Sequence, residues 1–235
     1  LGQHKRWILA APAYLIALAL PIASFYLMEA YEDTLAVLVL ALVLFLYLLY
    51  TFLVAVCEKG KILYAELSEV FVSVTYVVTC FSALTILRYL PMGKYYFGMV
   101  FIGAWVSDVF AYFTGVFFCR HKLIPEISPK KTVEGSIGGI VFASGGMVLY
   151  GFLLSLLADV VPSYATLALG GALLAVVGQI GDLLASLVKR EHGVKDYGRL
   201  MPGHGGIMDR FDSVLAVSAA TMILCLLLPP FTTSI

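Results

Sequence analysis

The sequence predicts an all-α, polytopic bundle of about seven transmembrane helices, and three observations lead to this fold class. Hydrophobic residues make up 61% of the 235 residues and charged residues only 13%, which lies well outside the usual range of soluble domains. The mean hydropathy is +0.97. The apolar residues gather into long runs separated by polar stretches, so the chain can cross a bilayer repeatedly.

The apolar runs are each about 20 residues long, which is the length that a helix needs to cross the hydrocarbon core. The third run is rich in valine and threonine, which also favour strands. An isolated strand could not satisfy its backbone in lipid, so a helix is predicted there as well. The predicted spans are 8–27, 35–57, 67–87, 96–118, 137–158, 165–188 and 213–233.

Basic residues are distributed unequally between the loops. With the N-terminus inside, all of the 15 lysines and arginines except Arg88 and Lys94 fall on the cytoplasmic side. The positive-inside rule therefore predicts a cytoplasmic N-terminus. The two longest polar loops, 119–136 and 189–212, then face the cytoplasm, and we expect the active site on that side. The short length without a targeting extension favours a bacterial inner membrane.

The chain shows no internal repeat and no linker, so we expect one bundle. Within it, residues 1–95 form N-terminal transmembrane helices and residues 96–235 form a catalytic transmembrane region. The formal net charge is zero, and a nucleic-acid partner would favour a basic surface. We therefore expect the lipid bilayer, and no nucleic acid, as a partner.

Two acidic residues fall inside predicted spans. Asp108 lies in the middle of the fourth span, and Asp182 lies in the cytoplasmic half of the sixth. Ionisable residues at such depth usually mark a functional cavity, although a hydrogen bond between helices is the alternative for Asp108. Gln179, Asp182 and Ser186 recur at i, i+3 and i+7, so they share one face of a helix that leads into the loop 189–212.

The loop 189–212 mixes basic, acidic and glycine residues in an ordered pattern. The run 202–206, Pro-Gly-His-Gly-Gly, predicts a tight turn with exposed backbone N–H groups, and such turns form anion-binding concavities. Basic side chains lie beside carboxylates that can hold a divalent ion. Phosphoryl or nucleotidyl transfer needs this combination.

The run from Ser186 to Asp212 resembles the signature of the phosphatidate cytidylyltransferase (CDP-diacylglycerol synthase) family. It matches the pattern Ser-x-apolar-Lys-Arg, four residues, Lys-Asp-x-small, then Pro-x-His-Gly-Gly-apolar-x-Asp-Arg-apolar-Asp at every polar position. Met201 stands where the family usually has Leu, Ile or Phe. A second stretch, Asp108-x3-Tyr112 with Ser-Pro-Lys-Lys-Thr-Val-Glu-Gly at 128–135, is also similar to the family, so the resemblance covers about residues 105–213.

The resemblance implies that CTP and phosphatidic acid react to give CDP-diacylglycerol and pyrophosphate with a divalent cation, usually magnesium. Two metal ions are expected, and one of them could be monovalent. The family's metal carboxylates fall on Asp182 and Asp196. The further residues assigned to catalysis are Lys189, Arg190, Lys195, His204, Asp209 and Arg210, and those assigned to substrate binding are Ser128, Lys130, Lys131, Thr132, Ser186, Gly205 and Gly206.

Within this hypothesis, Lys189, Arg190 and Lys195 would neutralise phosphate charge. His204, with the amides of Gly205 and Gly206, would contact the pyrophosphate or the ribose. Lys130, Lys131 and Ser128 would hold either the lipid headgroup or the nucleotide. Asp209 and Asp212 could bind metal or could orient Arg210 and Lys189, and the sequence leaves both alternatives open.

Two other functions compete with this interpretation. A CTP-dependent kinase of a polyprenol or phytol would transfer the γ-phosphate and release CDP. An ion-coupled transporter would use Asp108 and Asp182 as coupling sites, but such proteins usually carry internal repeats. An ether-linked lipid is an alternative acceptor, and the resemblance makes a homodimer possible.

Overall fold

The computed structural model describes residues 3–30, 33–59, 62–118, 120–198 and 206–233. Within them, seven helices are long and apolar enough to cross a membrane, which confirms the predicted all-α polytopic bundle. The third of these is helical despite its valines and threonines. The chain divides into two compact units, Leu1–Leu90 and Pro91–Ile235, a boundary slightly before the one expected at residue 95.

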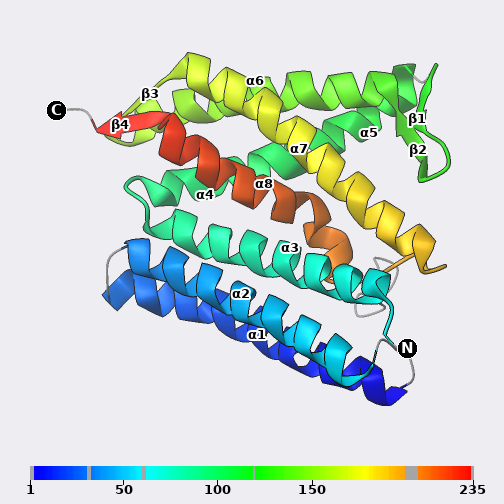
Figure 1. Ribbon diagram of the computed structural model, residues 1–235. Coiled ribbons are helices and arrows are strands. Elements are labelled where there is room, and N and C mark those ends of the chain that lie inside the picture. Colours follow the sequence, from blue (N-terminus) through cyan, green and yellow to red (C-terminus); the bar gives the residue numbers. More distant parts are fainter. Residues whose placement is uncertain (1–2, 31–32, 60–61, 119, 199–205, 234–235) are drawn as a thin grey trace. The chain divides into compact units, whose positions relative to one another are not determined.

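The first unit contains three helices that pack against one another, α1 (Gln3–Ala30), α2 (Asp33–Cys57) and α3 (Tyr64–Tyr89) (Figure 1). At one end they enclose a small apolar cluster built on Leu9, Val54, Ile62 and Leu67. Most other large apolar side chains of α1 and α2 are exposed, as expected for helices that face lipid.

Two tyrosines compensate for a proline inside α1. Pro12 has no N–H, so the carbonyl of Ile8, four residues earlier, loses its helical donor. The Tyr50 hydroxyl of α2 donates to that Ile8 carbonyl at 2.8 Å, and the Tyr47 hydroxyl donates to the Leu9 carbonyl at 3.2 Å. Because lipid offers no donor to a free carbonyl, these bonds fix α2 against the interrupted turn of α1.

The second unit contains the remaining spans and four short strands. In chain order its elements are α4 (Gly93–Phe101), a π-helical turn η1 (Ile102–Val106), α5 (Ser107–Phe118), β1 (Lys122–Ile124), β2 (Ser128–Thr132), α6 (Val133–Leu157), β3 (Val160–Pro162), α7 (Tyr164–Glu191), α8 (Met208–Leu227) and β4 (Phe231–Thr233). The hairpin β1–β2 lies at one end of α5 and α6, and the pair β3–β4 lies at the opposite end of α6 (Figure 1).

The last span begins and ends earlier than the sequence predicted. α8 starts at Met208, so Asp209 and Asp212 belong to its first turns instead of a loop. It ends at Leu227 because the following prolines, 229 and 230, cannot continue a helix. The chain then forms β4, whose Phe231 is buried among the rings of Tyr95, Tyr96 and Tyr150.

Glycines bring α6 close to α5. A Cβ atom on Gly135 would lie 2.5 Å from the Ala111 carbonyl oxygen, and one on Gly139 would lie 2.8 Å from the Ser107 carbonyl oxygen. Only glycine therefore permits this separation of the two helices. The close crossing sets the distance between Asp108 on α5 and the first turn of α6.

Replacing Tyr50 by phenylalanine should lower the free energy of unfolding by about 1 kcal/mol, since hydrogen bonds between membrane helices contribute about 0.6 and at most about 1.7 kcal/mol. Tyr14, which is 69% exposed, provides the matched control, and Tyr14→Phe should change little. Unfolding by denaturing detergent in mixed micelles measures both. Equal stabilities of the two variants would contradict the role given to Tyr50.

Gly139→Ala should destabilise the protein by about 1–3 kcal/mol because the added methyl group meets the backbone of α5. Gly145→Ala on the same helix should be neutral or slightly stabilising, since nothing lies within 4 Å of a Cβ there. Thermal melting in detergent compares the two. A larger loss at position 145 than at 139 would refute the close crossing.

Candidate active site

A cavity of about 640 Å³ with charged side chains in its lining lies among α5, the β1–β2 hairpin, the first turn of α6, α7 and the first turns of α8. Its charged lining residues are Asp108, Lys122, Lys130, Lys131, Asp182, Asp209 and Asp212. Four of these carboxylates come from three different transmembrane helices. The cavity therefore joins the two regions, 105–135 and 182–212, that the sequence had singled out separately.

The carboxylates of Asp108, Asp182 and Asp212 are close enough to repel one another. Asp108 follows the π-helical turn at the start of α5, a kind of distortion that is frequent at functional sites. Its Oδ2 accepts a hydrogen bond of 2.8 Å from the Ser213 hydroxyl of α8. Asp108 thus makes the helix–helix bond considered for it and also lines a cavity.

Lys131 neutralises Asp182 across the cavity. Its ammonium lies 2.7 Å from Asp182 Oδ2 and donates to the Gln179 carbonyl at 3.3 Å. Both side chains are mostly buried, with 23% and 27% of their surface exposed. The ion pair connects the end of β2 to the middle of α7.

A buried glutamine fixes the helix that carries Asp182. The Gln179 side chain accepts a hydrogen bond from the Ser136 hydroxyl, and its Nε2 donates to the Ser136 carbonyl at 3.1 Å and to the Ser107 hydroxyl at 3.4 Å. These bonds join α7 to α6 and α5. Gln179 and Asp182 both line the cavity, as expected from their common helix face, whereas Ser186 lies outside its lining.

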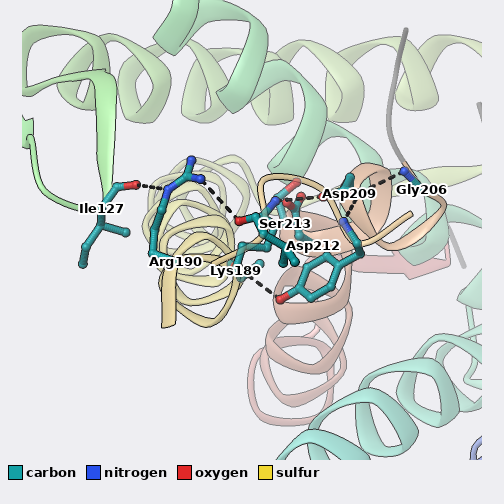
Figure 2. A network of polar contacts seen from close by, with 10 residues as sticks. Ile127, Lys189, Arg190, Gly206, Asp209, Asp212 and Ser213 are labelled. Atoms are coloured by element: carbon teal, nitrogen blue, oxygen red, sulfur yellow. Dashed lines mark hydrogen bonds and ion pairs between the residues drawn. The ribbon is translucent and has the colours of Figure 1, made fainter. Parts of the chain in front are cut away.

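Asp209 holds together both ends of the loop between α7 and α8. Its Oδ1 accepts a hydrogen bond from the buried Lys189 ammonium at 2.8 Å. Its Oδ2 accepts hydrogen bonds from the backbone N–H groups of Tyr197 at 2.8 Å and Gly206 at 2.9 Å (Figure 2). Gly198 and Gly206 are in contact, since a Cβ on Gly206 would lie 2.9 Å from Gly198 N. The arrangement favours the alternative in which Asp209 orients Lys189.

Tyr197 supports the same connection from the loop side. Its hydroxyl donates to the Ala185 carbonyl at 3.0 Å, and the Lys189 ammonium lies 5.1 Å from the centre of its ring. Burial raises the pKa of the Tyr197 hydroxyl, and the carboxylates of Asp209 and Asp212 raise it further. The hydroxyl therefore remains protonated at neutral pH and can keep donating.

The other predicted site residues lie at different places. Among the described residues, Lys130, Lys131 and Thr132 line the cavity, and Thr132 also caps α6 by accepting from Gly135 N at 3.0 Å. Ser128 begins β2 outside the lining. His204 and Gly205 fall outside the residues that the structure describes. The Gly206 amide was expected to contact substrate, but it donates to Asp209 instead.

The basic residues expected to neutralise phosphate are not gathered at the cavity. Lys189 is buried against Asp209. Arg190 is exposed and donates to the carbonyls of Ile127 at 3.5 Å and Val194 at 3.4 Å, which links α7 to the hairpin loop (Figure 2). Lys195 is exposed and lies outside the cavity lining, and so do two other predicted site residues, Asp196 and Arg210.

Several contributors to the site could not be identified from the sequence. Lys122 reaches the cavity because β1 pairs with β2, and neither strand was expected in this loop. The His121 Nδ1 atom lies 2.7 Å from Glu134 Oε1, and this contact fixes the base of the hairpin on α6. Ser136 carried no chemical signal, since a serine beside glycines in an apolar run is most simply a packing residue. Only the spatial contacts reveal these roles.

The donor set of the cavity fits a hard divalent cation, which prefers carboxylate oxygens. Within the described ranges, however, no three His, Cys, Asp or Glu side chains converge into a group that could hold a metal ion. Of the two carboxylates that the resemblance assigns to metal, Asp182 lines the cavity and has the Lys131 ammonium 2.7 Å from its Oδ2. Asp196 is exposed and lies outside the lining.

The fold and the cavity define an integral membrane protein with an acidic, lysine-bordered site inside its helical bundle. The model of the cytidylyltransferase family matches residues 2–228, and the chain belongs to this family.

Several curated relatives carry the name phosphatidate cytidylyltransferase. The chain is 40% identical to the phosphatidate cytidylyltransferase of Bacillus subtilis over 173 residues, which cover 73% of this chain and 61% of that protein. It is 36% identical to the Staphylococcus saprophyticus protein of that name, and the alignment covers 69% of this chain and 60% of that protein. It is 42% identical to the Thermotoga maritima protein of that name, and the alignment covers 53% of this chain and 47% of that protein. The aligned part thus spans about half to three fifths of these relatives.

Lys189→Met should destabilise the second unit by about 3 kcal/mol, at the lower end of the cost of breaking a buried ion pair, because Asp209 would keep its two backbone donors. Lys195→Met, at an exposed position of the following loop, should cost almost nothing. Melting temperatures in detergent compare them. A small and equal effect of both changes would contradict the organising role of the Lys189–Asp209 pair.

Proposed function

We propose that this protein transfers CMP from CTP to phosphatidic acid and releases pyrophosphate, which yields CDP-diacylglycerol for phospholipid synthesis. The observation that carries the proposal is the cavity itself, whose lining combines charged side chains with apolar surface within membrane-spanning helices. Its position suits a reaction between a water-soluble nucleotide and a membrane lipid. The names of the relatives support the choice of substrates.

The proposed reaction places few demands on general acid–base catalysis. The oxygen of the lipid phosphate is already anionic when it attacks the α-phosphorus of CTP, and the electrons of the broken P–O bond leave with pyrophosphate. Charge neutralisation and in-line positioning should therefore supply most of the rate acceleration. Lys122, Lys130 and Lys131 line the cavity and could offset phosphate charge. Phosphates carry several negative charges, so the acidic wall requires a further cation.

Magnesium is the cation that we propose for this role, and its chemistry when bound would be to neutralise and align phosphate oxygens. Asp182 would hold it through its carboxylate. Asp196 remains the second proposed ligand, reached by movement of its exposed loop, and a second ion, divalent or monovalent, is part of the proposal. Asp209 would keep the loop in place through its contacts with Tyr197 and Gly206.

The setting that we propose is a bacterial inner membrane, with the N-terminus and the cavity mouth on the cytoplasmic side. The excess of basic residues in the loops on that side supports this orientation. The bacterial sources of the relatives support the membrane. A homodimer is a further part of the proposal.

Asp182→Asn should reduce the formation of CDP-diacylglycerol by at least about a hundredfold, since one charge needed for cation binding is removed at the reacting phosphates. The measurement uses detergent-solubilised protein, labelled CTP, magnesium and phosphatidic acid, with lipid-linked CMP and pyrophosphate as products. Asp196→Asn is assayed in parallel. Asp159→Asn, at an exposed aspartate between α6 and β3, is the matched control and should retain full activity.

The products distinguish the competing functions. CDP release with phosphate transferred to an added prenol would replace this proposal by the polyprenol or phytol kinase. An ether-linked phosphatidate used in preference to the ester would change only the acceptor. No turnover of CTP with any lipid would refute both enzymes, and ion uptake into vesicles would then test Asp108 and Asp182 as transport sites.

A further inference from the structure

We propose that Lys131 is an exchangeable counter-ion: it occupies the Asp182 carboxylate until a divalent cation binds there, and it then transfers its charge to substrate phosphate. The inference deepens the proposed function and rests on its divalent cation at Asp182. It assigns different roles to two adjacent lysines, Lys130 and Lys131, which the sequence alone could not distinguish.

The contact between Lys131 and Asp182 has the geometry of a full ion pair. The ammonium lies 2.7 Å from Asp182 Oδ2, within the range of charge-assisted hydrogen bonds. The Gln179 carbonyl takes a second proton of the same ammonium at 3.3 Å. Both partners of the ammonium are thus on α7, and one of them is the carboxylate with the chemistry of a metal ligand.

The backbone of Lys131 is held rigidly, so only its side chain needs to move. Lys131 precedes Thr132, which pairs with Lys122 in the hairpin and caps α6 through Gly135 N. The Val133 N–H donates to the His121 carbonyl at 3.0 Å. From this fixed base, four rotatable side-chain bonds allow the ammonium to leave Asp182 and still remain inside the cavity.

The charges around Asp182 make an exchange of cations favourable. Asp108 and Asp212 face Asp182 closely enough to repel it, and Lys131 attracts both Asp108 and Asp182. One ammonium carries a single positive charge into this group, whereas a divalent ion carries two. An ion that binds the same oxygen, Asp182 Oδ2, must displace the ammonium, because two cations at such short range repel each other strongly.

Lys130 differs from Lys131 although it is adjacent in sequence. It lines the same cavity, but its side chain is exposed, so its charge is screened by solvent. Removing Lys130 lowers the positive charge of the cavity without freeing Asp182. The pair Lys130→Gln and Lys131→Gln therefore separates competition for one carboxylate from general electrostatics.

The test measures the affinity of purified protein for Mn²⁺ by electron paramagnetic resonance, in detergent and without CTP or lipid. Lys131→Gln should bind Mn²⁺ at least tenfold more tightly than the unmodified chain, equivalent to about 1.4 kcal/mol, because the competing ammonium is gone. Lys130→Gln should change the affinity by less than about threefold, as expected for a screened charge. Adding Asp182→Asn to Lys131→Gln should abolish the gain.

In turnover assays, Lys131→Gln should require less magnesium for half-maximal rate and should have a lower maximal rate, since phosphate loses its lysine. Equal Mn²⁺ affinities of the two lysine variants, or a gain that survives Asp182→Asn, would overturn the inference. Either of these Mn²⁺ results is compatible with normal CMP transfer, so the inference can fail while the proposed function still holds. Absence of Mn²⁺ binding in every variant would also overturn the inference.

A second measurement covers the case in which Lys131→Gln does not fold. The unmodified chain is labelled with an amine-reactive reagent, and labelling of Lys131 is compared with that of Lys130 by mass spectrometry. Mn²⁺ should increase the labelling of Lys131 severalfold and leave Lys130 unchanged, because the ammonium is released from its ion pair. Unchanged labelling at Lys131 in saturating Mn²⁺ would refute the exchange.

Discussion

The structure depends on one constraint: in a helical bundle that faces lipid, backbone carbonyls, side-chain amides and charges need partners within the protein. Pro12 frees a carbonyl of α1, and the Tyr50 hydroxyl satisfies it. Gln179 binds Ser136 and Ser107 between three helices. The same requirement holds for charges, which cost far more to bury without a partner, so the ion pairs of the second unit determine where its helices and loops can lie.

The two lysine–aspartate ion pairs of the second unit, one buried and one beside the cavity, serve different ends. Lys189 and Asp209 are enclosed, and the second oxygen of Asp209 is occupied by backbone donors, so this pair can organise the loop but has little freedom to change. Lys131 and Asp182 face a cavity, where another ion or a substrate could take either partner. A pair of the first kind stabilises a site, and a pair of the second kind can take part in its chemistry.

Sequence patterns predicted the helices of the fold well because a membrane span can be recognised from the length and hydropathy of its apolar run. The helix around Thr75 was predicted correctly although its composition favours strands, since lipid excludes the alternative. The start of α8 was predicted too late, because Asp209 and Asp212 read as loop residues. They lie in helical turns since their charges are met by a buried lysine and by backbone N–H groups, which no local pattern records.

The sequence by itself determined the class of protein, the number of spans and the two charged regions of interest, because these depend on composition and on the order of residues. It also identified Asp108 and Asp182 as unusual, since acids are rare within apolar runs. Only the tertiary structure decided which charges meet. Lys131 rather than Lys130 reaches Asp182, and Lys189 turns to Asp209, because pairing across α5–α8 depends on helix rotation and crossing distance, which residues far apart in the chain set together.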